Sequence, residues 1–256
     1  MRISVIQPDI KWEDKPANLE RLEMMIFESG DNADIIILPE MFSTGFTMNP
    51  ERVGEPFHSQ TLSWMLNISG KGNFGLCGSY VVRKKNLFLN RWVFVTPEKK
   101  IWYYDKHHLF TMGNENKSYS PGNRQLIFKF RGIRIMATVC YDLRFPVWNR
   151  NRNNYDLLIN SANWPQARRD AWSALLRARA IENQCYVAGS NRIGVDGEGI
   201  KYCGESMIIN PRGEIIASAV PDTECTAAAE ISITELSAFR KKFPVLRDAD
   251  RFSFIV

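Results

Sequence analysis

The pattern of apolar and polar positions divides the first part of the chain into a strand, a helix and a second strand. Residues 2–7 form a short β-type run that ends at Pro8. Residues 18–29 carry apolar side chains three and four positions apart, which predicts an amphipathic helix. Residues 33–38 are apolar almost throughout and contain three consecutive isoleucines, which indicates a strand covered on both faces. The β-α-β order predicts a sheet with helices packed against it.

The rest of the chain predicts more of both kinds of element. The middle segments predict a helix and then an antiparallel meander of three strands, over residues 59–69, 74–82, 87–96 and 100–104. Residues 105–121 are polar and have no clear period, which predicts a long loop of the kind often used for function. The later segments repeat the earlier order, with strands and helices at 125–130, 133–139, 145–151, 155–161, 169–183, 185–190, 205–210 and 214–219. In the long helix the spacing predicts one buried stripe, made of Ala171, Leu175, Ala178 and Ile181.

Length and composition are typical of one soluble globular domain. At 256 residues, with 45% hydrophobic and 24% charged residues and no linker rich in Gly, Ser or Pro, the chain predicts a single domain over residues 1–256. Residues 235–256 have no period of their own, so we expect a tail on another surface and not part of the core. No apolar run approaches the roughly 20 residues that span a bilayer, and no signal-peptide pattern is present. We therefore expect a cytoplasmic protein that does not interact with membranes.

The cysteines and histidines argue against a disulfide framework and a metal site. Five cysteines are widely spaced and include no Cys-x-x-Cys pair, which is typical of reduced thiols in a cytosol. Three histidines, two of them adjacent, do not indicate a histidine-ligated metal.

The formal charge of +5 introduces a nucleic-acid partner as an alternative. A basic patch would come from Arg150, Arg152, Arg168, Arg169 and the run 240–242. However, 33 basic residues are interleaved with 28 acidic ones along the whole chain. A mildly basic surface that favours anionic small molecules is the simpler interpretation, and we expect no nucleic-acid partner.

Three apolar or aromatic segments each end at one chemically reactive side chain, namely Glu40, Lys106 or Cys140. Because ligands bind at the carboxyl ends of strands in open α/β sheets, a carboxylate, an ammonium and a thiol delivered there could form a single site. Taken singly, Glu40 and Lys106 are also consistent with solvated charges just outside a strand. Cys140 is also consistent with a small buried apolar residue.

The turn after the strand at 133–139 has the chemistry of a nucleophile site. Cys140 stands where the strand ends, and Asp142 can cap a helix that starts there. A thiol on such a turn lies near unpaired helix amides, which favour a thiolate and later an oxyanion. The arrangement parallels the nucleophile elbow of serine hydrolases, with Cys in place of Ser.

Three motifs in this order resemble the catalytic motifs of the nitrilase, or carbon–nitrogen hydrolase, superfamily. They are Leu38-Pro39-Glu40, Asp105-Lys106-His107-His108-Leu109-Phe110 and Cys140-Tyr141-Asp142-Leu143-Arg144-Phe145-Pro146. The resemblance extends from the first strand to residues 211–215. It implies an α/β fold, a four-layer α-β-β-α sandwich with two pseudo-symmetric halves. It also implies a homodimer or larger homo-oligomer, with the tail at 235–256 at a subunit interface.

The resemblance implies a role for each motif residue. Glu40 would act as general base toward the thiol of Cys140, the nucleophile. Lys106 and the backbone amide of Tyr141 would stabilise the oxyanion that forms from an amide carbonyl. Glu115 matches the family's second carboxylate, which would hold Lys106 and tune Glu40. No cofactor and no metal are implied, because Lys106 polarises the carbonyl.

Further segments resemble the bacterial omega-amidases, which hydrolyse α-keto acid amides such as α-ketoglutaramate and α-ketosuccinamate. These segments are residues 41–46, 161–168 and 177–184. Such substrates carry a carboxylate, so the pocket needs a fixed cation, for which Arg168 is the candidate. Trp164 and Phe46 are candidate aromatic walls. Arg144 and Arg168 are also consistent with structural ion pairs, and Trp164 with a core residue.

Three hypotheses for function remain. The first is a cysteine-dependent omega-amidase that produces acid and ammonia through a thioester. The second is another short-chain amidase or an N-carbamoyl amide hydrolase, which would differ in the pocket but not in Glu40, Lys106 or Cys140. The third is a non-catalytic binding protein on the same scaffold.

Overall fold

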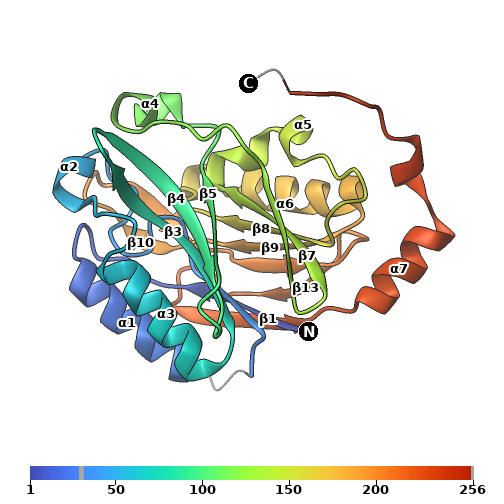
Figure 1. The fold of residues 1–256 in the computed structure, drawn as a ribbon, viewed down its shortest axis with the longest axis horizontal. Helices are drawn as coiled ribbons and strands as arrows, with labels where there is room; N and C mark the ends of the chain where they lie inside the picture. The colour runs from blue at the N-terminus through green and yellow to red at the C-terminus, as the bar shows by residue number, and fades with distance from the viewer. Residues whose placement is uncertain (29–31, 255–256) are drawn as a thin grey trace.

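Two mixed six-stranded β-sheets pack face to face in the computed structural model, which describes residues 1–28 and 32–254 (Figure 1). The first sheet has the order β14-β1-β2-β3-β4-β5, with strands Cys225–Glu230, Arg2–Gln7, Ile35–Ile37, Gly75–Lys84, Leu87–Val95 and Ile101–Asp105. The second has the order β6-β7-β8-β9-β12-β13, with strands Leu126–Phe130, Ile133–Val139, Leu157–Ser161, Tyr186–Ser190, Met207–Ile209 and Ile215–Ser218. A separate hairpin pairs β10 (Ile193–Val195) with β11 (Lys201–Cys203).

The two sheets share one internal pattern of strand directions. In the spatial order of each sheet, an edge strand lies antiparallel beside the first of three mutually parallel strands. Two further strands follow, each antiparallel to the one before it. Thus β1, β2 and β3 correspond to β7, β8 and β9. This repeat confirms the prediction of two pseudo-symmetric halves.

Helices cover the outer face of each sheet and so complete the four layers. α1 (Lys15–Glu28) and α3 (Gln60–Gly72) pack on the first sheet, and α6 (Arg169–Asn183) packs on the second (Figure 1). Short helices lie in the connections, namely α2 (Pro50–Val53), α4 (Glu115–Ser118), α5 (Pro146–Asn149) and the 3₁₀-helices η1 (Thr111–Gly113), η2 (Cys140–Arg144), η3 (Gln166–Arg168) and η4 (Val245–Asp248).

The three isoleucines of β2 show how one strand serves two apolar layers. Ile36 packs with the helices on the outer face, whereas Ile35 and Ile37 point into the core between the sheets. All three side chains are fully or almost fully buried. The unbroken apolar sequence of this strand therefore reflects burial on both faces, as predicted.

The long helix α6 has the predicted bounds but a different buried face. Its buried side chains are Trp172, Leu176, Arg179, Ala180 and Asn183. The predicted stripe is wrong, because Ala171, Leu175 and Ala178 are only half-buried and Ile181 is exposed. The physical reason is Arg179, whose guanidinium donates two hydrogen bonds to the carbonyl oxygen of Leu143, at 3.0 and 2.6 Å. A charged residue therefore belongs to the buried face.

Several short elements were not predicted. Residues 105–121 contain η1 and α4 and are not the unstructured loop that their sequence predicts. β14 pairs antiparallel with β1 along its full length of six residues, yet three of those six are alanines, which have little strand preference. The hairpin of β10 and β11 and the helix α2 were also missed.

The C-terminal segment begins with α7 (Ile233–Lys242), so the prediction that residues 235–256 have no period is wrong for their first part. The hydroxyl of Ser232 caps this helix, and Leu236 is buried beneath it. Further on, the ring centre of Phe254 lies 5.0 Å from that of Trp148. This part of the tail therefore packs on its own chain, and its place at a subunit interface stays a prediction.

The ends of two predicted segments, Ser29 of the first helix and residues 255–256 of the tail, lie outside the described residues. Within the described residues, 1–28 and 32–254, no helix is long and apolar enough to cross a membrane. In the same ranges, no three side chains of His, Cys, Asp or Glu are grouped so as to hold a metal ion.

Candidate active site

The three reactive side chains predicted at strand ends converge on one cavity. Glu40 and Lys106 follow β2 and β5 of the first sheet, whereas Cys140 follows β7 of the second sheet. All three line a cavity of about 400 Å³. Face-to-face packing of the two sheets therefore brings together groups that are distant in the sequence.

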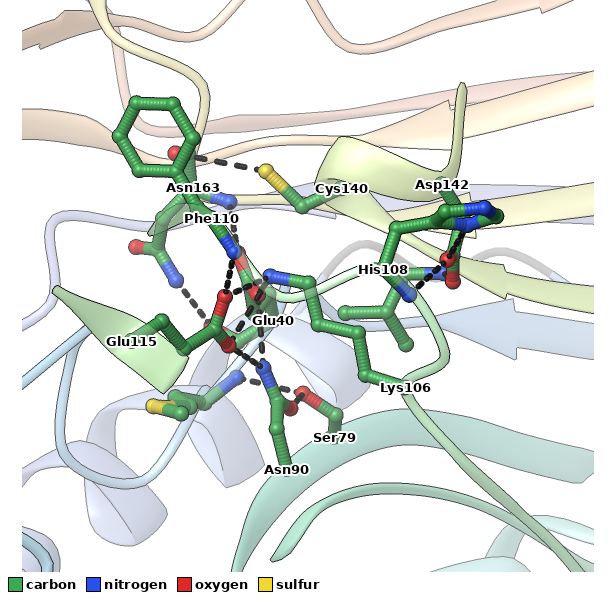
Figure 2. Close-up of polar contacts among 12 residues, drawn as sticks. Glu40, Ser79, Asn90, Lys106, His108, Phe110, Glu115, Cys140, Asp142 and Asn163 are labelled. Carbon is green, nitrogen blue, oxygen red and sulfur yellow. Dashed lines mark hydrogen bonds and ion pairs between the residues drawn. The ribbon is translucent and has the colours of Figure 1, made fainter. Parts of the chain in front are cut away.

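Cys140 stands on a tight turn with a strained backbone. β7 ends at Val139 and η2 begins at Cys140, whose φ of +43° lies in the left-handed region that residues with side chains rarely adopt. The thiol reaches the cavity, where Sγ lies 3.7 Å from the carbonyl oxygen of Asn163 (Figure 2). The predicted strand-to-helix turn is therefore present at Cys140.

Asp142 braces this turn from within. Its carboxylate accepts hydrogen bonds from the amide of Val139 at 3.0 Å, the amide of His108 at 2.9 Å and the hydroxyl of Tyr104 at 2.8 Å. The prediction that Asp142 is an N-cap is wrong, because it is the third residue of η2 and reaches back to the cap amide. Its contacts tie the segment after β5 to the turn after β7.

Lys106 lines the cavity and lies between two carboxylates (Figure 2). Its Nζ atom is 2.8 Å from Oε1 of Glu40 and 3.0 and 2.9 Å from the two carboxylate oxygens of Glu115. None of the three side chains is exposed. Glu115 comes from α4 and lies behind Lys106, and its Oε2 also accepts a hydrogen bond from the amide of Phe110 at 2.6 Å. The structure thus brings all four predicted catalytic residues together.

The charges in this network shift its proton affinities. Burial lowers the pKa of Lys106, but the negative charges of Glu115 and Glu40 outweigh burial and hold that pKa above its ordinary value. Burial raises the pKa of Glu115; Lys106 opposes this rise, and the charge of Glu40 adds to it. Lys106 therefore remains a cation at neutral pH.

The surroundings of the Cys140 thiol favour its neutral, protonated form. Burial raises its pKa well above the ordinary value, the charge of Glu40 raises it further, and Lys106 partly offsets both. The thiol is therefore protonated at neutral pH, although only the thiolate is a strong nucleophile. Activation needs a base within reach, and the carboxylate of Glu40, whose charge acts on the thiol, is the candidate for that role.

Two asparagines complete the network, and sequence reasoning missed both. Asn90 on β4 donates from Nδ2 to Oε1 of Glu40 at 2.8 Å and to Oε1 of Glu115 at 3.2 Å. The backbone amide of Asn163 donates to Oε2 of Glu40 at 2.9 Å. The available signal for Asn90 was an amide at the centre of the apolar run 87–96, because a buried amide requires partners.

The aromatic residues predicted to bind substrate line the same cavity. Nζ of Lys106 lies 5.1 Å from the ring centre of Phe46, and Tyr141 of η2 forms part of the wall. Trp164 also lines the cavity, but it is only 3% exposed and its ring centre is 5.5 Å from that of Trp172. Trp164 is therefore both a wall of the cavity and a core residue.

Two arginines place positive charge on the cavity wall. The guanidinium of Arg168, the predicted cation, lies 5.2 Å from the ring centre of Phe110. The guanidinium of Arg144, which was not predicted as a ligand, lies 4.9 Å from the ring centre of Trp164. The ion pairs found among the described residues involve neither arginine, so structural pairing does not account for them.

The β10–β11 hairpin forms a further wall that the sequence did not indicate. Asp196, Glu198, Ile200 and Tyr202 of this hairpin line the cavity. The carboxylate of Asp196 accepts a hydrogen bond from the hydroxyl of Tyr202 at 2.8 Å. It also accepts hydrogen bonds from the backbone amides of Glu198 and Ile200. These bonds fix the turn of the hairpin over the cavity.

Comparison with known proteins identifies the family. The carbon–nitrogen hydrolase family model matches residues 2–241. The chain belongs to the carbon–nitrogen hydrolase family.

Full-length relatives of this carbon–nitrogen hydrolase include named amidases. The omega-amidase YafV of Escherichia coli strain K12 is 44% identical over 98% of both chains. The 2-oxoglutaramate amidase of Bacillus subtilis strain 168 is 34% identical over 96% of both chains. The crystal structure of a CN-hydrolase superfamily protein from Xanthomonas campestris is 37% identical and has a TM-score of 0.96, covering 99% of this chain and 98% of that one. This likeness confirms the predicted sandwich fold.

Three arginines of the basic patch considered above have other partners in this hydrolase. Arg169 pairs with Glu205, Arg240 pairs with Asp156, and Arg168 lines the cavity. Their charges are therefore used within the fold or at the cavity. These contacts weaken the nucleic-acid hypothesis.

Proposed function

We propose that this carbon–nitrogen hydrolase is an omega-amidase that converts α-keto acid amides, such as α-ketoglutaramate or α-ketosuccinamate, to the acid and ammonia. One observation carries the proposal: a cationic Lys106 lies between Glu40 and Glu115 and lines, with Cys140, a cavity that has arginines on its wall. The 44% identity with an omega-amidase and the 34% identity with a 2-oxoglutaramate amidase support this substrate class.

The first half of the reaction forms a thioester. Glu40 takes the proton of Cys140, and the thiolate attacks the carbonyl carbon of the terminal amide. The developing oxyanion is stabilised by Nζ of Lys106 and by the backbone amide of Tyr141, two donors fixed before the reaction begins. Glu40 returns the proton to the nitrogen as the carbon–nitrogen bond breaks, and ammonia leaves.

The second half of the reaction regenerates the thiol. Glu40 accepts a proton from a water molecule, which attacks the thioester carbonyl at the same oxyanion position. The acid product leaves as the proton returns to Cys140. Glu115 is not among the residues that line the cavity, and its role is to hold Lys106, at 3.0 and 2.9 Å.

The substrate carboxylate binds at the wall that carries Arg168. A guanidinium that has no carboxylate partner among the described residues is suited to a fork-like pair with a substrate carboxylate. Arg144 on the same wall contributes a second positive charge. Phe46, Tyr141 and Trp164 enclose the apolar part of a short substrate.

The test is an ammonia-release panel with α-ketoglutaramate, glutamine, propionamide and an N-carbamoyl amine. We expect fast release from α-ketoglutaramate by the wild type and none by Cys140→Ala. Preference for the uncharged amide or the N-carbamoyl amine would replace omega-amidase with the second hypothesis. Absence of turnover with every compound would favour the binding-protein hypothesis.

We also propose that residues 1–256 act as one domain in the cytoplasm, as a homodimer or larger homo-oligomer with the tail at the interface. Packing of the described tail along its own chain, through Phe254 and Trp148, leaves its outer surface for such a contact. Light scattering during size-exclusion chromatography, on the full chain and on a chain truncated after Lys242, tests this. A monomeric full chain would contradict it.

A further inference from the structure

The hydrogen bonds around Glu40 use its two carboxylate oxygens differently. Oε1 accepts from Nζ of Lys106 and from Nδ2 of Asn90, each at 2.8 Å (Figure 2). Within residues 1–28 and 32–254, the one hydrogen-bond donor placed on Oε2 at close range is the amide of Asn163, at 2.9 Å. The carbonyl oxygen of this same Asn163 lies 3.7 Å from Sγ of Cys140. Oε2 therefore retains acceptor capacity on the side of the thiol.

Asn90 is fixed in this orientation by a second set of contacts. The hydroxyl of Ser79 on β3 donates to Oδ1 of Asn90 at 2.8 Å, and its oxygen accepts the amide of Met41, the residue after Glu40, at 2.9 Å. A carboxylate can only accept, so Nδ2 must face Glu40 and Oδ1 must face the hydroxyl. Ser79 and Asn90 are both completely buried. The amide therefore has one orientation in which every contact is satisfied.

We propose that Asn90 is a positioning residue that reserves Oε2 of Glu40 for the thiol proton. This inference rests on the proposed function and specifies how its base works. As the S–H bond of Cys140 breaks, the proton passes to Oε2 and the electron pair stays on sulfur. The proton then passes from Oε2 to the amide nitrogen as the carbon–nitrogen bond breaks. Oε1 stays bound to Lys106 and Asn90 throughout.

Asn90 also supplies a donor that Lys106 alone cannot provide. Two buried carboxylates share one ammonium, and Nδ2 of Asn90 reaches both of them, at 2.8 Å to Glu40 and 3.2 Å to Glu115. Lys106, Glu115, Cys140 and Tyr119 are titratable groups on which the charge of Glu40 acts. Substitution of Asn90 changes none of these groups, so it isolates the contribution of the amide.

The kinetic test compares Asn90→Ala with Asn160→Ala. Asn160 is a matched control, because it is completely buried on β8 and its Nδ2 bonds to Thr138 at 3.0 Å, away from Glu40. We expect Asn90→Ala to lower kcat for α-ketoglutaramate about 10- to 100-fold and to leave KM within about threefold. The acid limb of its pH–rate profile should move to higher pH, because a carboxylate with one donor fewer is protonated more easily. Asn160→Ala should keep the wild-type pH profile.

A second measurement separates this inference from the proposed function. Alkylation of Cys140 by iodoacetamide, followed by mass spectrometry of its peptide, reports activation of the thiol without any amide turnover. We expect alkylation at neutral pH to be about tenfold slower in Asn90→Ala than in the wild type. If the wild type hydrolyses no omega-amide but Asn90→Ala still slows alkylation, the proposed function fails and the role of Asn90 stands.

Stability is followed alongside both measurements by urea denaturation. If Asn90→Ala does not fold, Ser79→Ala serves instead, because it removes the anchor of Asn90 and leaves the amide in place. It should shift the acid limb and the alkylation rate in the same direction by a smaller factor. A folded variant of either kind with the wild-type acid limb and alkylation rate would overturn the inference. So would losses no larger than those of Asn160→Ala.

Discussion

Nζ of Lys106 lies 2.8 Å from Oε1 of Glu40, and neither side chain has any exposed surface. Glu115 binds the same ammonium from the other side, at 2.9 Å. The three groups together carry one excess negative charge when both carboxylates are ionised, and none of their side chains has exposed surface. Removal of the cation and removal of one anion must therefore have different consequences.

We expect Lys106→Ala to lose both activity and stability, and Glu40→Gln to lose activity alone. The first change leaves two buried carboxylates without a cation, which should lower the free energy of unfolding by about 3–5 kcal/mol. The second change leaves Lys106 paired with Glu115, so the free energy of unfolding should change by about 1 kcal/mol or less. Urea denaturation and ammonia release on the same preparations test this. A Lys106→Ala protein as stable as Glu40→Gln would contradict the charge argument.

Arg168→Gln should raise KM for α-ketoglutaramate and leave an uncharged amide unaffected. A hydrogen bond to a charged group contributes about 1.5–3 kcal/mol, which corresponds to roughly a 10- to 100-fold change in KM. Arg144→Gln is the matched comparison, because Arg144 lies on the same wall, over Trp164 at 4.9 Å. A larger rise in KM for Arg144→Gln than for Arg168→Gln would assign the substrate carboxylate to Arg144.

Arg240→Ala should weaken the attachment of α7 and lower the free energy of unfolding by an amount that depends on pH. The guanidinium binds Asp156 at 2.9 Å and the carbonyl oxygens of Gln184 and Tyr155 at 2.9 and 2.8 Å. We expect a loss of about 1–3 kcal/mol in the free energy of unfolding at pH 7. Lys241→Ala, a change at an exposed position of the same helix, should cost less than about 0.5 kcal/mol.

The pH dependence of this loss follows from Asp156. Burial raises the pKa of Asp156, but hydrogen bonds and charge from Arg134 and Arg240 outweigh burial and hold that pKa below its ordinary value. The pair therefore contributes stability above the ordinary carboxyl pKa of about 4 and loses it as pH falls through the lower folded value. The difference in the free energy of unfolding between wild type and Arg240→Ala, measured with urea, should become smaller as the pH is lowered from about 5 to roughly 3. A difference that is constant with pH would mean that the ion pair is not its source.

Local sequence pattern was sufficient for the parts of the fold that depend on one segment. β7 and α6 have the bounds that their sequences predict, because a β-branched run and a 3.6-residue period are local signals. β14 was missed because its alanines acquire strand structure only by pairing with β1. The face of α6 was mispredicted because the buried position of Arg179 depends on a carbonyl contributed by Leu143, from another segment.

The same division applies to the site. Glu40, Lys106 and Cys140 stand at strand ends within recognisable motifs, so the sequence indicates them directly. Asn90 and Arg144 acquire their positions only when the two sheets and the cavity wall have formed. Sequence spacing contains no information about such contacts, which is why both were absent from the predicted site.

The backbone of Cys140 provides a test that does not depend on catalysis. Its φ of +43° is unfavourable for a residue with a side chain, by about 1–2 kcal/mol relative to glycine. We therefore expect Cys140→Gly to be more stable toward urea than Cys140→Ala by about 1 kcal/mol, although both lack the nucleophile. Cys185 is the control, since it is another free cysteine, it is buried, and its φ is not positive. There glycine should be less stable than alanine by about 0.5–1 kcal/mol, because it loses more conformational freedom on folding. If the glycine variant were less stable than the alanine variant at both positions, the turn would hold Cys140 without backbone strain.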